Sequence, residues 1–207
     1  MNEKIFEYYD KLSQNATTPL VVRNKAKDST EYDVEFLKKY ADKNQTLLDL
    51  GSGTGLTINN LKNDFKNIIA VEKYKEFYKF IDKDIQIIEQ NILDFNFDIE
   101  FDIISIFGVL PYFSYEEAKQ LYTNIYNSFS GKIIVKNQFG VSEDVTVDGY
   151  SEELDTYYFS QYRHLDKEIK LLESIGFKIE EVVDIYPNKY NRWENTHFYA
   201  LVFKKAS

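Results

Sequence analysis

The sequence contains no cysteine, and this absence excludes several kinds of chemistry at once. Disulfide bridges, thiolate nucleophiles and cysteine-ligated metals are all ruled out. Long apolar runs are missing too, because no stretch approaches the roughly 20 residues that a membrane span needs. The first residues, MNEKIFE, are charged and lack the apolar centre of a signal peptide. We therefore expect a cytoplasmic protein with no membrane partner.

Basic residues are too few to balance the acidic ones, with 25 Lys and Arg against 34 Asp and Glu and a net charge of -9. Nucleic acids are bound through their phosphates, which require a basic surface. No Lys/Arg cluster is long enough to suggest such a surface, so we expect a small-molecule substrate and no nucleic acid. Histidine is also scarce, and no His/Asp/Glu cluster has the spacing of metal ligands, which predicts no metal site.

The chain is nevertheless rich in what a folded core needs. Hydrophobic residues make up 43% and aromatic residues 16% of its 207 residues, which argues against disorder. One domain over residues 1–207 is the expected organisation, as a monomer or homodimer. Residues 1–43 predict two helices that form a cap or lid, and residues 44–207 predict the ligand-binding core.

The most informative stretch is TLLDLGSGTGL, from Thr46 to Leu56. It predicts a buried strand, a glycine loop and then a helix that extends to about Phe65. Glycines let a backbone bend tightly and approach a ligand closely, and the amide groups of the following helix end then face that ligand. The dinucleotide fingerprint G-x-G-x-x-G has its third glycine three residues after the second. Here Gly55 follows Gly53 by only two residues, which disfavours NAD.

Asp49 and the three glycines instead form D-x-G-x-G-x-G, which resembles motif I of the class I S-adenosylmethionine-dependent methyltransferases. The resemblance implies S-adenosyl-L-methionine as cofactor and S-adenosyl-L-homocysteine as product. It also implies a three-layer α/β fold of Rossmann-like type around a seven-stranded sheet. The implied strand order is 3-2-1-4-5-7-6 with strand 7 antiparallel, behind an N-terminal helical cap.

Further segments agree with this resemblance in the expected order. Residues 67–72 predict a second buried strand that ends in Glu72, whose carboxylate can accept hydrogen bonds from ribose hydroxyls. Residues 85–89 predict a third strand. After it the family usually carries an Asp that holds the adenine amino group. Asn91 stands there instead, and its carbonyl oxygen can also accept that hydrogen bond. We prefer it to the alternative, Asp94, which lies three residues on and is expected to be a helix cap or a solvated acid.

A strand at residues 101–106 leads into FGVLPY, which resembles the fourth motif of the family. Phe107 would face the methionine part of the cofactor. DNA amino-methyltransferases grip a flipped base with D/N-P-P-Y/F at this place. The chain has Val109 at the start of the corresponding tetrapeptide, so that activity is disfavoured. Tyr112 remains a candidate for substrate contact.

The cofactor-binding residues implied by the resemblance are Asp49, Gly51, Ser52, Gly53, Gly55, Glu72, Lys73, Asn91, Ile92 and Phe107.

The acceptor-side candidates come from two other parts of the chain. Residues 74–81 predict a helix, residues 137–158 a long acidic loop, and that loop leads into the aromatic and basic run YYFSQYRH. In this run His164 is a candidate base or substrate ligand, and Arg163 is a candidate partner for an anionic acceptor. The predicted catalytic residues are His164, Tyr112 and Arg163, and the predicted substrate-binding residues are Tyr9, Arg23 and Tyr162.

The leading functional hypothesis is methyl transfer from S-adenosylmethionine to an oxygen or nitrogen of a small polar metabolite. The acceptor would be a sugar, a nucleotide-sugar or a phosphate-bearing glycan precursor. The alternatives are a protein or natural-product methyltransferase of the same fold, and a non-catalytic S-adenosylmethionine-binding regulatory module.

Overall fold

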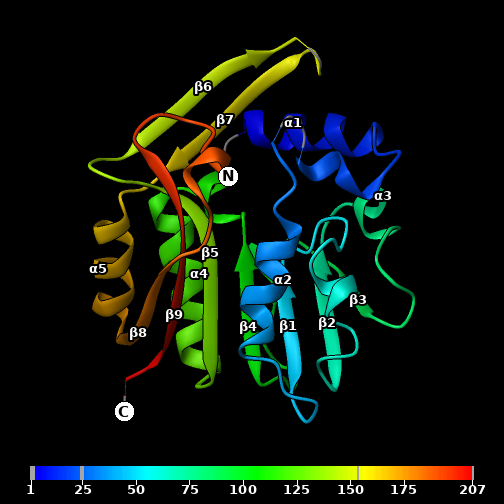
Figure 1. The fold of residues 1–207 in the computed structure, drawn as a ribbon, viewed down its shortest axis with the longest axis vertical. Helices are drawn as coiled ribbons and strands as arrows, with labels where there is room; N and C mark the ends of the chain where they lie inside the picture. Colours follow the sequence, from blue (N-terminus) through cyan, green and yellow to red (C-terminus); the bar gives the residue numbers. More distant parts are fainter. Residues whose placement is uncertain (1–2, 24–25, 153, 207) are drawn as a thin grey trace.

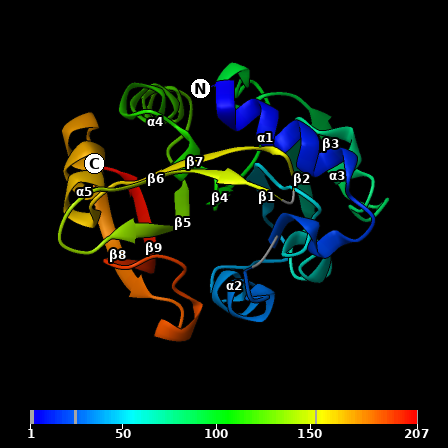
Figure 2. The same ribbon diagram turned by 90° about the horizontal axis from the view of Figure 1, so that it is seen from above.

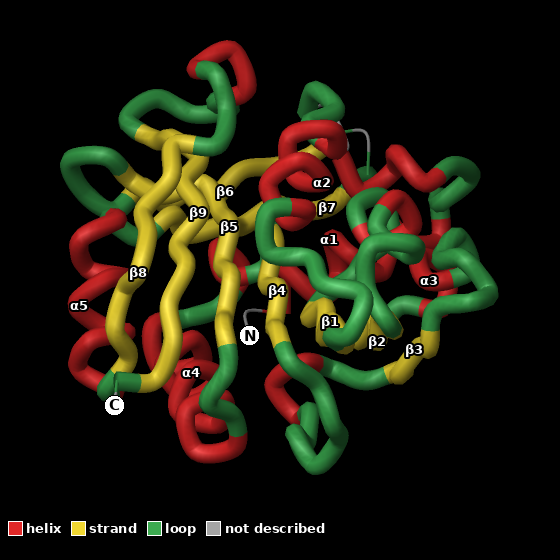
Figure 3. Tube along the Cα trace, turned by 60° about the horizontal axis from the view of Figure 1, so that its bottom comes forward, coloured by secondary structure: helices red, strands yellow, loops and turns green. Residues whose placement is uncertain are grey.

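The computed structural model describes residues 3–23, 26–152 and 154–206. Seven strands form one sheet in the order β3-β2-β1-β4-β5-β9-β8, and they run side by side in Figure 3. The strands of this sheet are β1 (Thr46–Leu50), β2 (Asn67–Glu72), β3 (Gln86–Glu89), β4 (Ile103–Phe107), β5 (Lys132–Gly140), β8 (Phe177–Asp184) and β9 (Thr196–Lys205).

The predicted strand order and direction are confirmed. The pairs β1–β2, β1–β4, β2–β3 and β4–β5 are parallel, whereas β9 runs antiparallel to both β5 and β8. The central strands are apolar on both faces, as expected for a parallel sheet covered on both sides. The strand order reverses between β1 and β4, and ligands of such sheets bind beyond the carboxyl ends of the strands near this point.

Helices cover the two faces of the sheet unequally (Figure 2). On one face, α4 (Tyr115–Ser128) and α5 (Leu165–Ile175) enclose the larger core, whose central residues include Leu48, Ile106 and Tyr122. On the other face lie α2 (Thr30–Lys38) and the short 3-10 turn η2 (Ile58–Asn60), which pack on the smaller core. The sheet is therefore the middle of three layers.

The N-terminal segment divides between two places. Helix α1 (Glu3–Gln14) lies above the carboxyl ends of the strands, and η1 (Pro19–Arg23) follows it toward the glycine loop (Figure 1). Helix α2, in contrast, packs on the sheet face through Phe36 and Leu37. Only α1 and η1 therefore have the position expected of a lid, and α2 belongs to the layered core.

Two predicted helices are much shorter than expected. In place of a helix over residues 56–65 the structure has turns and η2, and in place of one over 74–81 it has α3 (Lys75–Tyr78). The first difference has a local cause. The side chain of Asn59 donates to Phe80 O at 3.0 Å and accepts from Asp82 N at 2.9 Å, while Asn60 donates to Leu56 O. Asn side chains that bond to backbone groups compete with helical hydrogen bonds.

The predicted loop over residues 137–158 is also wrong. Strand β5 continues to Gly140, and an antiparallel hairpin of β6 (Val145–Ser151) and β7 (Thr156–Tyr162) follows, separate from the main sheet (Figure 1). None of the residues of β6 is fully buried. The alternation of buried apolar and exposed residues, from which a strand is predicted, is therefore weak in β6.

The hairpin lies over α1. Tyr158 of β7 packs edge-on against Tyr8 at a ring-centroid distance of 5.1 Å, and Lys4 Nζ lies 2.8 Å from a carboxylate oxygen of Asp148. The hairpin therefore fixes α1 above the sheet. Among the described helices, none is long and apolar enough to cross a membrane.

Candidate functional site

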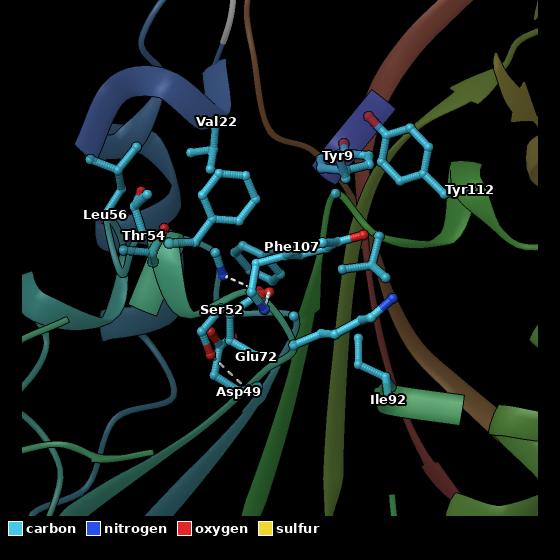
Figure 4. Close-up of a pocket in the computed structure, with 18 of the residues that line it drawn as sticks. Tyr9, Val22, Asp49, Ser52, Thr54, Leu56, Glu72, Ile92, Phe107 and Tyr112 are labelled. Carbon is cyan, nitrogen blue, oxygen red and sulfur yellow. Dashed lines mark hydrogen bonds between the residues drawn. The ribbon is translucent and has the colours of Figure 1, made fainter. Parts of the chain in front are cut away.

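A cavity of about 250 Å³ lies beyond the carboxyl ends of β1, β2 and β4 and beneath α1 and η1. Figure 4 shows Asp49, Ser52 and Glu72 together on one side of it, with Tyr9 and Tyr112 on the other. Predicted residues that line it are Tyr9, Arg23, Asp49, Gly51, Ser52, Gly53, Glu72, Lys73, Asn91, Ile92, Phe107 and Tyr112. The fold thus brings together residues separated by more than a hundred positions.

The glycine loop forms the sheet-side wall of this cavity. Gly51 N donates to Val71 O at 2.9 Å, which joins the loop to β2, and Gly51 has φ +80°. A Cβ at Gly51 would lie 2.5 Å from Val109 Cγ2. Gly53, with φ +53°, has only Val22 Cγ1 in range, at 3.4 Å. Gly51 is therefore needed for packing as well as conformation, whereas Gly53 presents bare backbone to the cavity.

Gly55 has the same left-handed conformation and closes the loop through a hydrogen bond from its N–H to Ser52 O at 2.9 Å. It does not line the cavity itself.

Glu72 is buried at the end of β2. Its Oε2 accepts from Gly53 N at 2.8 Å and its Oε1 accepts from Tyr74 N at 2.9 Å. Burial raises the pKa of Glu72, and the backbone hydrogen bonds from Tyr74 and Gly53 oppose that rise. Each carboxylate oxygen has a second acceptor position, so Glu72 can still accept from hydroxyl groups of a ligand.

Asp49 is a second buried carboxylate, at the end of β1. Its Oδ1 accepts from Ser105 Oγ at 2.5 Å. Burial raises the pKa of Asp49 above its ordinary value, and the Ser105 hydrogen bond acts in the opposite direction. A buried carboxylate that faces a cavity with few donors is well suited to a cationic or donor-rich ligand.

The segment after β3 forms the far end of the cavity. Asn91 begins the short turn η3 (Ile92–Asp94), and its Oδ1 accepts from Leu93 N at 3.1 Å. The predicted acceptor of the adenine amino group thus already holds one hydrogen bond and keeps one acceptor position. Lys73 lies nearby, with its Nζ 4.1 Å from the centroid of the Phe6 ring of α1.

The opposite wall is aromatic. Tyr9 and Tyr112 pack edge-to-face with their ring centroids 5.0 Å apart. Burial raises the pKa of both hydroxyl groups well above 10.0. Both therefore stay protonated near neutral pH and can donate a hydrogen bond, but they cannot act as phenolate bases.

Arg23 reaches the cavity from η1. Its Nη2 donates to Thr30 Oγ1 at 3.0 Å and lies 3.3 Å from Asp33 Oδ2, so it holds η1 against the start of α2. The side chain is one-fifth exposed and is available to a ligand.

Two predicted catalytic residues lie outside the cavity. Arg163 is buried beneath α5, where its Nε donates to Glu168 Oε2 at 2.6 Å and its Nη1 donates to Phe113 O at 3.0 Å. His164 Nε2 lies 2.9 Å from Val141 O at the start of α5. Neither lines the cavity. We therefore replace the predicted catalytic role of Arg163 by a structural one, and no longer assign a base to His164.

Tyr162, a predicted substrate ligand, lies behind the aromatic wall instead of in it. Its hydroxyl oxygen accepts from Trp193 Nε1 at 3.0 Å and lies 3.1 Å from the Tyr158 hydroxyl. Tyr158 in turn packs against Tyr112 with ring centroids 6.4 Å apart. Tyr162 therefore supports the wall without forming its surface.

Sequence reasoning missed two charged residues that line the cavity, Lys136 of β5 and Asp33 of α2. Both are buried and their side chains meet at 3.2 Å. A signal for Lys136 was present, because it ends the apolar run IIVK at the strand edge where ligands of such sheets bind. Asp33 had no comparable signal, since only the packing of α2 brings it to this edge.

The cavity matches the chemistry of S-adenosylmethionine. Gly53 presents bare backbone to the cavity, and the buried carboxylates of Asp49 and Glu72 are groups that can bind an ammonium group or hydroxyls. Among the residues that the structure describes, no three His, Asp or Glu side chains gather as a metal site.

Solved structures share this fold. DhpI in complex with SAH is 14% identical, with a TM-score of 0.75 over 99% of this chain and 96% of that chain. A methyltransferase from Listeria monocytogenes, described as a putative S-adenosylmethionine-dependent enzyme, is 14% identical, with a TM-score of 0.67 over 86% and 100%. The glycopeptide N-methyltransferase MtfA with S-adenosylmethionine is 12% identical, with a TM-score of 0.68 over 88% and 96%.

At these identities the likeness establishes the fold. No curated protein matched the sequence. The family model for ribosomal RNA adenine dimethylase matches residues 11–146, which include the glycine loop, Glu72, Asn91 and the FGVLPY segment. This match covers more than half of the chain. The chain therefore belongs to the ribosomal RNA adenine dimethylase family and is a class I S-adenosylmethionine-dependent methyltransferase.

Proposed function

We propose that this enzyme methylates an oxygen or nitrogen atom of a small polar metabolite. The observation that carries the proposal is the enclosure of the cavity by α1 and η1, with Ile5, Phe6 and Tyr9 in its lining. Because these residues of α1 lie over the cavity, a compact acceptor fits beneath them more readily than a segment of a macromolecule.

The donor would lie along the ends of β1, β2 and β3. We assign the ribose hydroxyls to Glu72, the adenine to Asn91 and Ile92, with Lys73 beside them, and the amino-acid part to Asp49 and Phe107. The glycine loop over Gly51, Ser52, Gly53 and Gly55 would supply backbone contacts. Bound S-adenosylmethionine supplies a methyl group already activated by the positive sulfur.

The acceptor would then lie between the donor and the aromatic wall. Tyr9 and Tyr112 contribute flat apolar surfaces and protonated hydroxyl groups that can orient an acceptor oxygen or nitrogen. Arg23 also lines the cavity, and its guanidinium group suits a phosphate or carboxylate of the acceptor. These assignments favour a polar acceptor with an anionic group, such as a phosphate-bearing sugar.

Positioning and exclusion of water would supply most of the rate acceleration. Holding the acceptor in line with an activated methyl group turns a bimolecular step into an intramolecular one, and the cover of α1 and η1 keeps water away. A neutral amine can attack without prior loss of its proton. A base is required only when the acceptor must be deprotonated during attack.

Adenine methylation in RNA is the second candidate, and the name of the family favours it. Three observations of this chain speak against it. The net charge is -9, which disfavours binding to phosphate backbones. Val109 occupies the place where base-gripping tetrapeptides carry Asp or Asn, and it packs directly on Gly51. Helix α1 lies over the cavity and the hairpin packs on α1, which leaves less access for a base held in a polynucleotide.

A methyl-incorporation assay separates these candidates. The enzyme would be incubated with S-adenosylmethionine labelled in its methyl group and either a small-metabolite extract or unmodified ribosomal RNA. We expect label in the metabolite fraction and background label in RNA. Tyr112→Ala should lower incorporation without weakening the binding of S-adenosylhomocysteine, whereas Tyr157→Ala, an exposed position on the hairpin, is the matched control. Label in RNA alone would overturn the proposal.

A further inference from the structure

Four charged side chains gather where η1, α2, β1 and β5 meet at the cavity. Lys136 Nζ lies 3.2 Å from a carboxylate oxygen of Asp33, and Arg23 Nη2 lies 3.3 Å from Asp33 Oδ2. Asp49 completes the group and is close enough to interact electrostatically with both Asp33 and Lys136. All four line the same cavity.

Lys136 is the unusual member of this group because it is 3% exposed. Its ammonium lies among three aromatic rings, at 5.0 Å from the centroid of Phe107, 5.2 Å from Tyr186 and 5.9 Å from Phe198. Among the described residues, Asp33 is the one hydrogen-bond acceptor of Lys136 Nζ. An ammonium carries three N–H donors, so donors remain for a ligand in the cavity.

Asp33 is engaged from several sides. Its carboxylate accepts from Lys136, from Arg23 and from the hydroxyl of Tyr186, which also accepts from Ser29 Oγ at 3.1 Å. Asp33 thus keeps its position independently of any ligand. It holds Lys136 at a fixed point on the cavity wall.

The two cations and two carboxylates of this group are unevenly paired. Asp33 is shared by two cations, Lys136 and Arg23, whereas Asp49 lines the same cavity without an ion pair of its own among the described residues. A further carboxylate, Asp28, lies 3.6 Å from Arg23 Nε, but its side chain is half exposed and therefore screened by solvent. The cavity accordingly offers one buried negative group and a neighbouring positive group at the same end.

This arrangement is complementary to a zwitterion. The amino-acid end of S-adenosylmethionine carries an ammonium and a carboxylate on one carbon atom. If its ammonium neutralises Asp49, a cationic surplus remains at Lys136 and Arg23, and the carboxylate on the same carbon balances it. We propose that Lys136, positioned by Asp33, binds the α-carboxylate of the methyl donor and so selects ligands with an intact amino-acid end.

The test compares two ligands by calorimetry. S-Adenosylhomocysteine has the amino-acid end, whereas 5′-methylthioadenosine lacks it and retains the adenine and ribose. In Lys136→Met we expect affinity for S-adenosylhomocysteine to fall about 10- to 100-fold, the range for a hydrogen bond between charged groups. Affinity for 5′-methylthioadenosine should change by less than about threefold, as for a substitution outside the binding contacts.

Lys132→Met is the matched control, because Lys132 lies on the same strand and pairs with Glu180 outside the cavity. It should leave both affinities unchanged. Asp33→Asn removes the charge that positions Lys136. It should also weaken the binding of S-adenosylhomocysteine more than that of 5′-methylthioadenosine. Thermal unfolding of each variant checks that the fold is retained.

A measurement on the unmodified protein gives an independent answer should Lys136→Met fail to fold. S-Adenosylmethionine should bind about 10-fold or more tightly than its decarboxylated analogue. Equal affinities for these two ligands would overturn the proposal. An equal loss of affinity for S-adenosylhomocysteine and 5′-methylthioadenosine in Lys136→Met would also overturn it and would indicate a structural lysine. Unchanged affinity for both ligands would overturn it as well and would assign the lysine to the acceptor.

Discussion

At the scale of single residues, Asp49 and Glu72 are buried carboxylates at the ends of β1 and β2 that line the cavity. Both are buried carboxylates with raised pKa values, and in both burial is the main cause. Ser105 compensates Asp49 through one hydrogen bond, and two backbone amides compensate Glu72. Buried carboxylates with so few donors cost folding free energy, which a cationic or hydroxyl-bearing ligand would recover.

Asp49→Asn should therefore stabilise the folded protein and weaken its binding of the cofactor. Because the folded-state pKa of Asp49 is raised above 3.8, the folded protein holds this proton more tightly than the unfolded chain does. The resulting stabilisation is complete below pH 3.8 and is lost as the pH rises through the raised folded-state pKa. At pH 7 the neutral amide avoids this cost, so we expect the free energy of unfolding to rise by about 1 kcal/mol.

Urea unfolding and calorimetry with S-adenosylhomocysteine would measure both effects. The variant should bind the ligand at least about 10-fold more weakly, because a charge-assisted hydrogen bond to the ammonium is lost. Glu116→Gln, an exposed acid on α4, serves as control and should alter neither quantity. Reduced stability together with unchanged affinity would contradict the assignment of Asp49.

At the scale of elements, the packing of α4 and α5 explains why Arg163 is buried away from the cavity. This arginine donates to Glu168 of α5 and to the carbonyl of Phe113, and Glu168 also accepts from the hydroxyl of Tyr122 in α4. Glu168 and Tyr122 are fully buried. The three side chains thus join α4, α5 and the segment after β4 beneath the sheet. Their role is to hold these elements together.

Glu168→Gln should consequently destabilise the fold without affecting ligand binding. Removing one member of a buried ion pair leaves the other charge uncompensated, and we expect a loss of about 3 to 5 kcal/mol in the free energy of unfolding. Denaturant titration gives this value, with the exposed Glu173→Gln of the same helix as control. Turnover per folded molecule should be unchanged, and a selective loss of turnover would restore a catalytic role to Arg163.

The cover of the cavity is also a matter of elements. Thr54 Oγ1 donates to Pro19 O at 2.6 Å, and Val22 lies against Gly53, so η1 is attached directly to the glycine loop. Helix α1 is held from above by the hairpin through Tyr8 and Tyr158. The glycine loop, η1, α1 and the hairpin therefore belong to one continuous set of contacts.

At the scale of the whole molecule, the net charge of -9 leads us to expect weak binding to nucleic acid. Proteins that bind nucleic acid non-specifically do so with dissociation constants of roughly 1 to 100 µM at physiological salt, through neutralised phosphates. We expect this protein to bind ribosomal RNA more weakly than about 100 µM under those conditions. Fluorescence anisotropy with a labelled RNA fragment at several salt concentrations is the measurement. Micromolar binding that weakens steeply with salt would favour the RNA candidate.

The sequence by itself determined the sheet and the glycine loop that lines the cavity. The strands are runs of apolar residues long enough to be recognised, and the spacing of the glycines after Asp49 is a local property of the backbone. The positions of Glu72 and Asn91 at the cavity could be predicted because each lies at or just after the end of such a strand. These signals lie within a few residues of one another, so no knowledge of distant contacts was required.

Only the tertiary structure decided the acceptor side and the buried charges. Arg163 contacts Glu168, and not the cavity, because of the way the chain continues into α5. The adjacent residue Tyr162 points elsewhere and contacts Trp193. Asp33 meets Lys136 across 103 residues because α2 packs on the sheet face instead of joining the lid. Such contacts depend on the direction in which whole elements pack, and the local sequence around each residue does not indicate that direction.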